Sequence, residues 1–238
     1  MVGGRLAAAM RTHVGLVRRE NEDSIVASPG ERLWAVADGM GGHARGAWAS
    51  QTVCAALAAT PLGHSLNGDC ERVADALEHA NELIVAEGEK SGHTVGTTVV
   101  ALLVSGDRLA CLWSGDSRCY RLRGGTLRQL TRDHSQVAEL VDAGLITEEE
   151  ARHHPLGNVV TRAIGVARGL ALDVVEDALA PGDSLLLCSD GLNKCLNDAE
   201  IADTLAGRDP EEGCGALVAA VLDRGAPDNV SVILVRYT

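Results

Sequence analysis

Three aspartates stand in similar settings along the chain and could together bind a cation. Asp38 and Asp190 each end an apolar run and precede a glycine, and Asp228 lies just before the apolar C-terminal run. A carboxylate at the end of a buried strand is held near the rim of the sheet, and a glycine beside it lets the backbone approach a ligand. Carboxylates that converge repel one another unless a cation lies between them, and Mg²⁺ and Mn²⁺ prefer such oxygen ligands. Because Asp-Gly is also common in ordinary turns, a metal site requires that all three residues meet in the fold.

Two other segments carry residues that would suit the same site. Arg18, Glu22 and Asp23 lie together just before an apolar run, and Asp116 lies between two apolar runs, directly after Gly115. Each segment by itself could be a solvated loop. Together with the three aspartates, they strengthen the case for a cation site.

The apolar pattern predicts the strands that would position these residues. Strands are expected at 23–28, 32–37, 97–104, 108–114, 118–123, 126–130, 171–175, 183–189 and 229–237. The turns at 105–107 and 124–125 are too short for a parallel crossover, so they predict antiparallel hairpins. The last strand is apolar on both faces, which is typical of a central strand in a sheet that is covered on both sides.

Helices are expected between and after these strands, at 44–59, 71–87, 198–206 and 210–223. The segment 133–167 is more polar and holds two short helical pieces, 135–143 and 147–153, so we expect a flap subdomain there. Helices combined with antiparallel strands predict an α+β layered architecture. No linker or repeat divides the chain, and we expect one domain over 1–238.

Composition excludes several classes of protein. The 238 residues carry a formal net charge of −12, which argues against a nucleic-acid binder. No apolar run approaches the roughly 20 residues that span a bilayer, and no signal peptide is evident, so we expect a cytoplasmic protein without membrane association. The seven cysteines include no C-x-x-C pair, which disfavours zinc and disulfides and favours reduced core residues.

Seven short motifs, in order and at fitting intervals, resemble those of the metal-dependent protein serine/threonine phosphatases of the protein phosphatase 2C type, in their compact bacterial form. No one motif is decisive, but the ordered set is highly specific and covers the chain from about Gly15 onward. The motifs are Gly15-Leu16-Val17-Arg18 with Asn21-Glu22-Asp23-Ser24, Ala37-Asp38-Gly39-Met40-Gly41-Gly42-His43, Gly96-Thr97-Thr98, Gly115-Asp116-Ser117-Arg118, Leu130-Thr131 with Asp133-His134-Ser135, Cys188-Ser189-Asp190-Gly191-Leu192, and Pro227-Asp228-Asn229-Val230.

The resemblance implies a fold and a set of metal ligands. The fold would be a four-layer α-β-β-α sandwich, in which helices flank two packed antiparallel sheets and the flap lies beside the active site. Asp38 would bridge two ions, and the carbonyl of Gly39 would bind one of them. Asp190 and Asp228 would complete the other site, and Asp116 would help to hold a third, weaker ion.

The resemblance also assigns roles around the ions. Glu22 and Asp23 would act through coordinated water, and Arg18 would hold the substrate phosphate with its planar, two-pronged guanidinium. Arg19 is the neighbouring alternative, and the four-residue interval to Glu22 favours Arg18. His43 is a possible general acid, or else it orders a loop.

The implied activity is hydrolysis of phosphoserine and phosphothreonine on proteins by a water that two Mn²⁺ or Mg²⁺ ions activate. No phosphoenzyme forms in this scheme, so it needs no nucleophilic cysteine or serine. The expected partners are phosphorylated proteins and a Ser/Thr kinase whose action the enzyme opposes. A monomer is the expected state.

Two positions depart from patterns found among other members of the family. Met40 stands where some members carry a histidine, and Lys194 stands where many carry an aspartate near the metals. A cation at 194 could weaken the third ion or alter the metal requirement. The main rival function is a catalytically inactive relative that binds phosphoproteins, which loss of the metal ligands would favour. The loose G-x-G-x-x-A pattern after Asp38 could suggest dinucleotide binding, but the hairpins contradict the parallel sheet that this requires.

Overall fold

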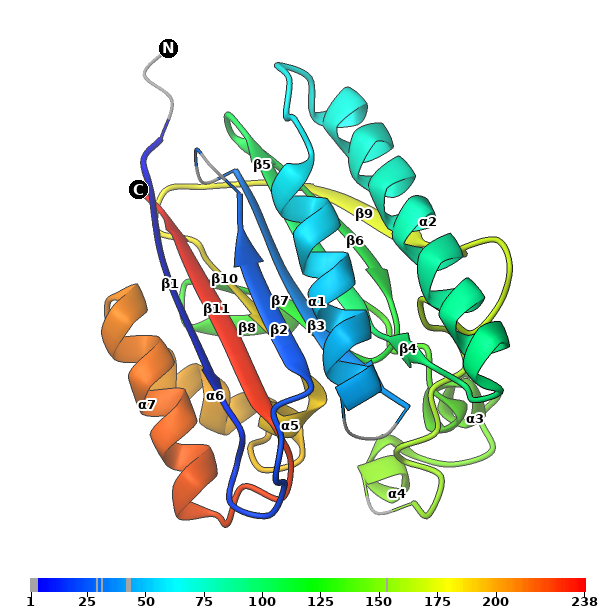
Figure 1. Cartoon of the computed structure of the whole chain (residues 1–238). Coiled ribbons are helices and arrows are strands. Elements are labelled where there is room, and N and C mark those ends of the chain that lie inside the picture. Colours follow the sequence, from blue (N-terminus) through cyan, green and yellow to red (C-terminus); the bar gives the residue numbers. More distant parts are fainter. Residues whose placement is uncertain (1–3, 29, 31, 42–43, 153) are drawn as a thin grey trace.

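The chain folds into two antiparallel sheets that pack face to face, with helices on both outer surfaces (Figure 1). The structure is a computed structural model that describes residues 4–28, 30, 32–41, 44–152 and 154–238. The expected four-layer α-β-β-α arrangement is confirmed. The two sheets and the segments at their ends place the acidic residues that the sequence predicted.

The first sheet contains the C-terminal strand near its middle. Its order is β1 (Leu6–His13), β11 (Val230–Tyr237), β10 (Ser184–Cys188), β7 (Arg118–Arg123) and β8 (Thr126–Gln129). On its outer face lie α5 (Asp190–Asn193), α6 (Asp198–Leu205) and α7 (Pro210–Asp223). β11 is buried along nearly its whole length, which confirms the prediction of a central strand.

The second sheet carries the N-terminal half of the site. Its order is β2 (Asp23–Ala27), β3 (Leu33–Met40), β5 (Val99–Ser105), β6 (Arg108–Ser114) and β9 (Asp173–Ala178), and β4 (Gly96–Thr97) pairs with β3. α1 (Ala44–Ala59) and α2 (Leu66–Ser91) cover its outer face. Within the described residues, no helix is long and apolar enough to cross a membrane.

A buried apolar layer joins the two sheets. Alternate residues of β3, such as Trp34 and Val36, point into it and meet Leu185, Leu187 and Ile233 of the first sheet. The other face of β3, with Leu33, Ala35 and Ala37, packs against the helices. Burial on both faces explains why these segments are apolar throughout.

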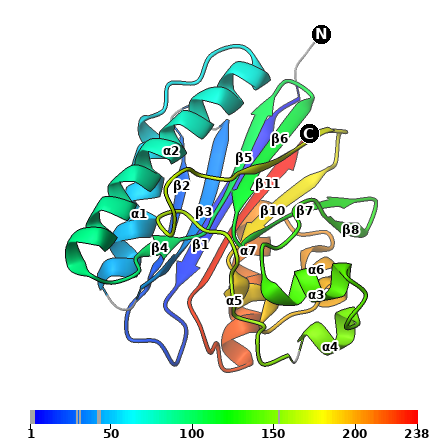
Figure 2. The ribbon, with the colours of Figure 1, turned by 90° about the vertical axis from the view of Figure 1, so that its right-hand side faces the viewer.

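The segment 115–117 carries the chain from one sheet to the other, because β6 belongs to the second sheet and β7 to the first. The expected hairpins β5–β6 and β7–β8 are confirmed on either side of this crossing. The flap holds α3 (Gln136–Asp142) and α4 (Glu148–Arg152), close to the predicted helices, and projects beyond the ends of the strands (Figure 2).

Four elements differ from the sequence-based expectations. The sequence analysis expected no strand at β1, which is rich in alanine and mostly exposed, because alanine gives little strand signal. α2 begins at Leu66 rather than at 71, because the side chain of Ser65 caps it. β3 continues past Asp38 because Gly39 and Met40 pair with β4. Asp190 begins a short helix, α5, directly after the strand.

Gly191 of α5 packs against the backbone at the start of β11. A Cβ at this position would lie 1.8 Å from the carbonyl oxygen of Asn229, so any side chain must push α5 away from β11. We predict that Gly191→Ala lowers the free energy of unfolding by about 3 kcal/mol or more, as overpacking of a rigid backbone does. Thermal and urea unfolding would measure this.

Gly215→Ala is the matched control, because a Cβ there would meet nothing closer than Arg11 Nε at 3.7 Å. Gly215 lies inside α7, where alanine should be neutral or stabilise by about 0.5–1 kcal/mol. Equal stabilities for the two variants would contradict the close packing of α5 on β11.

Candidate metal and phosphate site

The predicted acidic residues converge at the end of the sandwich where the two sheets meet. Asp23 and Asp38 are directly opposite each other on β2 and β3 of the second sheet. Asp190 and Asp228 follow β10 and precede β11 in the first sheet, and Asp116 lies on the crossing between the sheets. The two sheets thus contribute carboxylates to one cluster.

Buried hydrogen bonds tie the two sheets together at Asp23. Its Oδ2 accepts hydrogen bonds from the hydroxyls of Ser189 and Ser231, each at 2.7 Å. The backbone N–H of Ser189 donates to the carbonyl of Ser231 at 3.1 Å, so the ends of β10 and β11 are held together as well. The spacing between the aspartates of the two sheets is therefore fixed by the fold.

The side chain of Asn229 holds the loop that carries Arg18 and Glu22. Its Nδ2 donates to the carbonyls of Val14 (2.9 Å) and Glu20 (3.0 Å), and its Oδ1 accepts from the backbone N–H of Glu22 at 2.9 Å. Sequence analysis gave Asn229 no role. A buried side-chain amide that bonds only to backbone groups gives no local sequence pattern that would reveal it.

Two threonines fix the backbone of Asp38. The hydroxyl of Thr97 donates to the Asp38 carbonyl at 2.9 Å, and that of Thr98 accepts from the Asp38 N–H at 3.1 Å. The Thr98 hydroxyl also bonds to Ser117 Oγ at 2.7 Å, which connects β3 to the loop of Asp116. A Cβ on Gly39 would lie 2.1 Å from the carbonyl oxygen of Gly46, so only glycine fits after Asp38.

The carboxylates strongly perturb one another. Burial, followed by the charges of Asp23, Asp190 and Asp116, raises the pKa of Asp38 well above its usual range. Burial also raises the pKa of Asp23 to about 6 and that of Asp116 to about 7, and the charge of Asp190 adds to both. A cluster with these properties needs a cation to be fully ionised at neutral pH.

Two basic side chains meet the cluster at Asp228. Arg18 makes a two-pronged ion pair with it, at 2.8 Å from Nε to Oδ1 and 2.9 Å from Nη2 to Oδ2. Lys194 Nζ lies 2.7 Å from Asp228 Oδ2 and 2.5 Å from Asp190 Oδ2. Burial by itself raises the pKa of Asp228, but the hydrogen bonds and charges of Lys194 and Arg18 outweigh it and lower that pKa.

The donor set fits a hard divalent cation that keeps some of its water. Oδ1 of Asp190 and Oδ1 of Asp23 are buried and have no hydrogen-bond partner among the residues that the structure describes. Within the part of the chain that the structure describes, no three or more His, Cys, Asp and Glu side chains are arranged to hold an ion by themselves. Backbone carbonyls and water would have to complete the coordination, as is usual for Mg²⁺.

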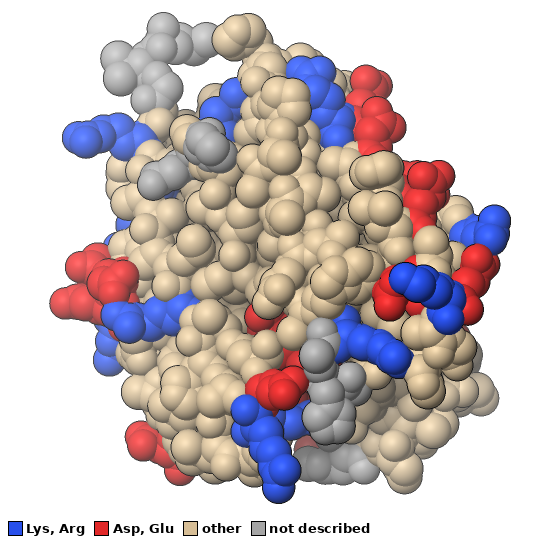
Figure 3. All heavy atoms as spheres, viewed as in Figure 1, with Lys and Arg blue, Asp and Glu red and all other residues tan. Residues whose placement is uncertain are grey.

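The remaining sequence-predicted residues are distributed around this cluster. The backbone of Glu22 adjoins Asp38, because the N–H of Gly39 donates to the Glu22 carbonyl at 3.1 Å. His43 lies outside the described residues. On the face seen in Figure 3, acidic and basic side chains lie around the rim and at the lower centre, whereas the middle is largely uncharged.

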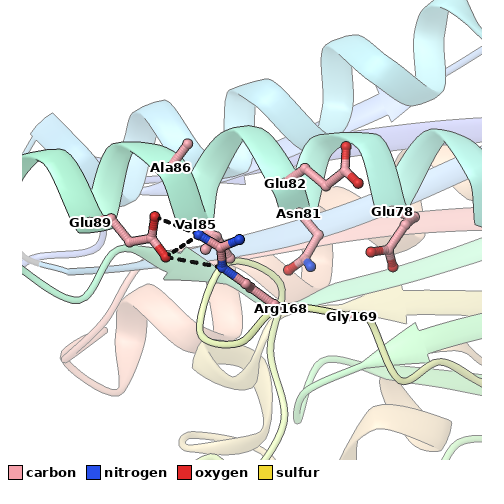
Figure 4. Close-up of a pocket in the computed structure, with 8 residues that line it drawn as sticks. All are labelled: Glu78, Asn81, Glu82, Val85, Ala86, Glu89, Arg168 and Gly169. Atoms are coloured by element: carbon pink, nitrogen blue, oxygen red, sulfur yellow. Dashed lines mark hydrogen bonds and ion pairs between the residues drawn. The ribbon is translucent and has the colours of Figure 1, made fainter.

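A separate hollow of about 290 Å³ lies between α2 and the segment that follows the flap (Figure 4). Glu78, Glu82 and Glu89 border it, and Arg168 pairs with Glu89 at 2.8 Å. None of the sequence-predicted site residues lines it. Asn81, in the wall of this hollow, has a structural role. Its Oδ1 accepts a hydrogen bond from the Gly165 N–H at 2.7 Å and so holds the end of the flap against α2.

Comparison with known proteins finds relatives of this chain along nearly its whole length. A sequence profile of the protein phosphatase 2C family matches residues 11–222. The chain is 42% identical over 232 residues to the serine/threonine protein phosphatase PstP of Mycobacterium tuberculosis, a match that takes in 96% of this chain and 44% of PstP. The chain thus spans less than half the length of that relative.

Solved structures agree with this match. PppA, described as a key regulatory component of T6SS in Pseudomonas aeruginosa, superposes with a TM-score of 0.93 at 43% identity over 99% of both chains. The catalytic domain of the serine/threonine phosphatase PstP in complex with two manganese ions superposes with a TM-score of 0.88 at 39% identity over 98% of both chains.

Asp23 should make the metal-free protein less stable as the pH rises. Its pKa in the folded state is about 6, above the unfolded value of about 3.9, so the folded state holds this proton more tightly. The stabilisation is present below about pH 4 and is lost as the pH rises through about 6, with a size on the order of 3 kcal/mol.

Asp23→Asn removes this titration. Urea unfolding in EDTA should show the variant gaining stability relative to the wild type between about pH 4 and about pH 7. Any cost of the new amide that does not depend on pH cancels in this comparison. A difference between the two proteins that stays constant with pH would contradict the raised pKa.

Proposed function

The chain belongs to the protein phosphatase 2C family, and on that basis we propose that it hydrolyses phosphoserine and phosphothreonine on proteins. The observation that carries the proposal is the buried cluster of carboxylates between the two sheets, with Arg18 at its edge. Such a cluster would be strongly destabilising without a role that requires it, because like charges in a buried site raise each other's pKa. The rival, a phosphoprotein-binding relative that has lost its metal ligands, is disfavoured because the carboxylates are all in place.

The metal ligands that we propose follow from the positions of these residues. Asp38 would contact both ions, as the family resemblance implies, and its place opposite Asp23 on the second sheet supports this role. The carbonyl of Gly39 would serve one ion, and Asp190 with Asp228 would serve the other. Asp116, on the crossing segment, would serve a third.

Glu22 and Asp23 would orient water around the ions. Asp23 already accepts two hydroxyl hydrogen bonds through Oδ2, while its Oδ1 has no hydrogen-bond partner among the described residues. That oxygen suits a hydrogen bond to water beside a cation. The ions themselves would be Mn²⁺ or Mg²⁺, and the two manganese ions of the PstP catalytic domain support the former.

When bound, the ions would activate a water as the nucleophile and offset the charge of the phosphoryl group. The chain's own residues would position the substrate. Arg18 is held against Asp228 and its side chain is 56% exposed, so it can turn from that carboxylate to a phosphate without crossing the core. Its fork matches two phosphate oxygens as well as it matches two carboxylate oxygens. The flap would contact the protein that carries the phosphate.

The wider setting that we propose is regulatory. The enzyme would act as a cytoplasmic monomer with one phosphatase domain, and it would oppose a Ser/Thr kinase whose phosphorylated loop is a candidate substrate. The likeness to PppA over 99% of both chains supports such a role, because PppA is described as a regulatory component of T6SS.

Asp38→Asn should abolish metal-dependent hydrolysis while the fold persists. The substitution replaces the carboxylate that would contact both ions with a neutral amide. We therefore expect kcat/KM to fall by about a thousandfold or more. The assay is phosphate release from p-nitrophenyl phosphate and from a phosphothreonine peptide, with EDTA, Mg²⁺ or Mn²⁺. Cys188→Ser is the control and should keep most of the activity. A folded wild type that releases no phosphate with either metal would contradict the proposal and favour the binding function.

Arg18→Ala should raise KM for the phosphothreonine peptide by about tenfold to a hundredfold and change kcat less, because a charge-assisted contact to the phosphate is lost. Arg19→Ala is the matched control, since it removes the same charge one residue away. An equal effect of the two substitutions would indicate that general attraction, rather than a direct contact, explains the role of this segment.

A further inference from the structure

We propose that Lys194 is a tethered cation that occupies the space between Asp190 and Asp228, and that a divalent ion must displace it to bind there. The inference rests on the proposed function, because it concerns the same metal site. It predicts that this chain binds divalent ions more weakly than it would with an uncharged residue at 194.

The fold places the ammonium group of Lys194 in this position. Lys194 directly follows α5 and lies four residues after Asp190, so both side chains are on one side of the helical turn. Its N–H donates to the Asp190 carbonyl at 2.9 Å, which closes that turn. The preceding residue, Asn193, is fixed by a hydrogen bond from its Nδ2 to the Tyr120 hydroxyl at 2.8 Å.

Lys194 contacts the two carboxylates that are proposed to serve one ion. Nζ lies 2.5 Å from Oδ2 of Asp190 and 2.7 Å from Oδ2 of Asp228. An ammonium group only donates hydrogen bonds, so these contacts employ the same lone pairs that would face a cation. A divalent ion bound to the same two carboxylates would be repelled by the ammonium group, so the two cations compete for this position.

The charge of Lys194 reaches beyond its two direct partners. It also favours the ionised forms of Asp38 and Asp116, because it lowers the pKa of each against the larger effect of burial. Lys194 therefore partly neutralises the cluster by itself. The cation that would otherwise do so must compete with a group that the backbone holds in place.

Mn²⁺ titration of variants tests this competition directly. The sequence holds two lysines, and Lys90 is exposed at the end of α2, so Lys90→Gln removes the same charge outside the cluster. Calorimetry with MnCl₂ and no substrate should show Lys194→Gln binding Mn²⁺ about tenfold to a hundredfold more tightly than the wild type. Lys90→Gln should match the wild type.

A labelling experiment on the wild type tests the displacement without any substitution. The protein is treated with an amine-acetylating reagent, and the two lysines are followed by mass spectrometry with and without saturating Mn²⁺. Acetylation of Lys194 should rise severalfold when Mn²⁺ is present, while that of Lys90 stays constant. Labelling of Lys194 that does not respond to Mn²⁺ would overturn the proposal even if Lys194→Gln failed to fold.

These outcomes separate this inference from the proposed function. Equal Mn²⁺ affinity in the wild type and in folded Lys194→Gln would overturn the tethered-cation role and leave the phosphatase function intact. A wild type that binds Mn²⁺ but releases no phosphate would overturn the function and leave the role of Lys194 standing. Absence of Mn²⁺ binding in both folded proteins would overturn both.

Discussion

Mutual repulsion among buried carboxylates is the constraint on which the rest of the structure depends. Burial at the meeting point of two sheets raises the pKa of Asp38, Asp23 and Asp116, and the charge of Asp190 raises all three further. Neither a hydrophobic core nor a hydrogen-bond network can remove that repulsion; a cation can. A divalent ion therefore has a thermodynamic reason to bind here, and its binding is coupled to the stability of the whole sandwich.

The packing of the two sheets and the hydrogen bonds between them hold the aspartates in place. The apolar layer between the sheets fixes their separation, while the hydroxyls that bind Asp23 lie at one end of the sandwich. Ser189 and Ser231 bring the ends of β10 and β11 to Asp23, and Asn229 brings the N-terminal loop to the same place. These contacts hold the acidic groups close together although their charges favour separation. The proposed role of Lys194 has the same basis, because its ammonium group offsets part of the repulsion among the aspartates.

The sequence predicted the parts of this arrangement that leave a local signal. Apolar runs and short turns gave the antiparallel strands and the main helices, and the motif order gave the two-sheet fold. β1 left no such signal, because an exposed, alanine-rich edge strand forms only through its pairing with β11. The structuring role of Asn229 and the contact of Lys194 with Asp228 arise from residues that are distant in the chain, so spacing alone could not reveal them. The ligand assignments remain predictions, which the convergence of the carboxylates supports.

Anomalous diffraction from crystals grown with Mn²⁺ tests the central claim most directly, because it locates the ions without reference to activity. The account predicts peaks within coordination distance of Asp38, with one ion also contacted by Asp190 and Asp228 and with Lys194 turned away from both. A well-ordered structure at saturating Mn²⁺ with no peak beside Asp38, or with ions bound only elsewhere, would contradict the account.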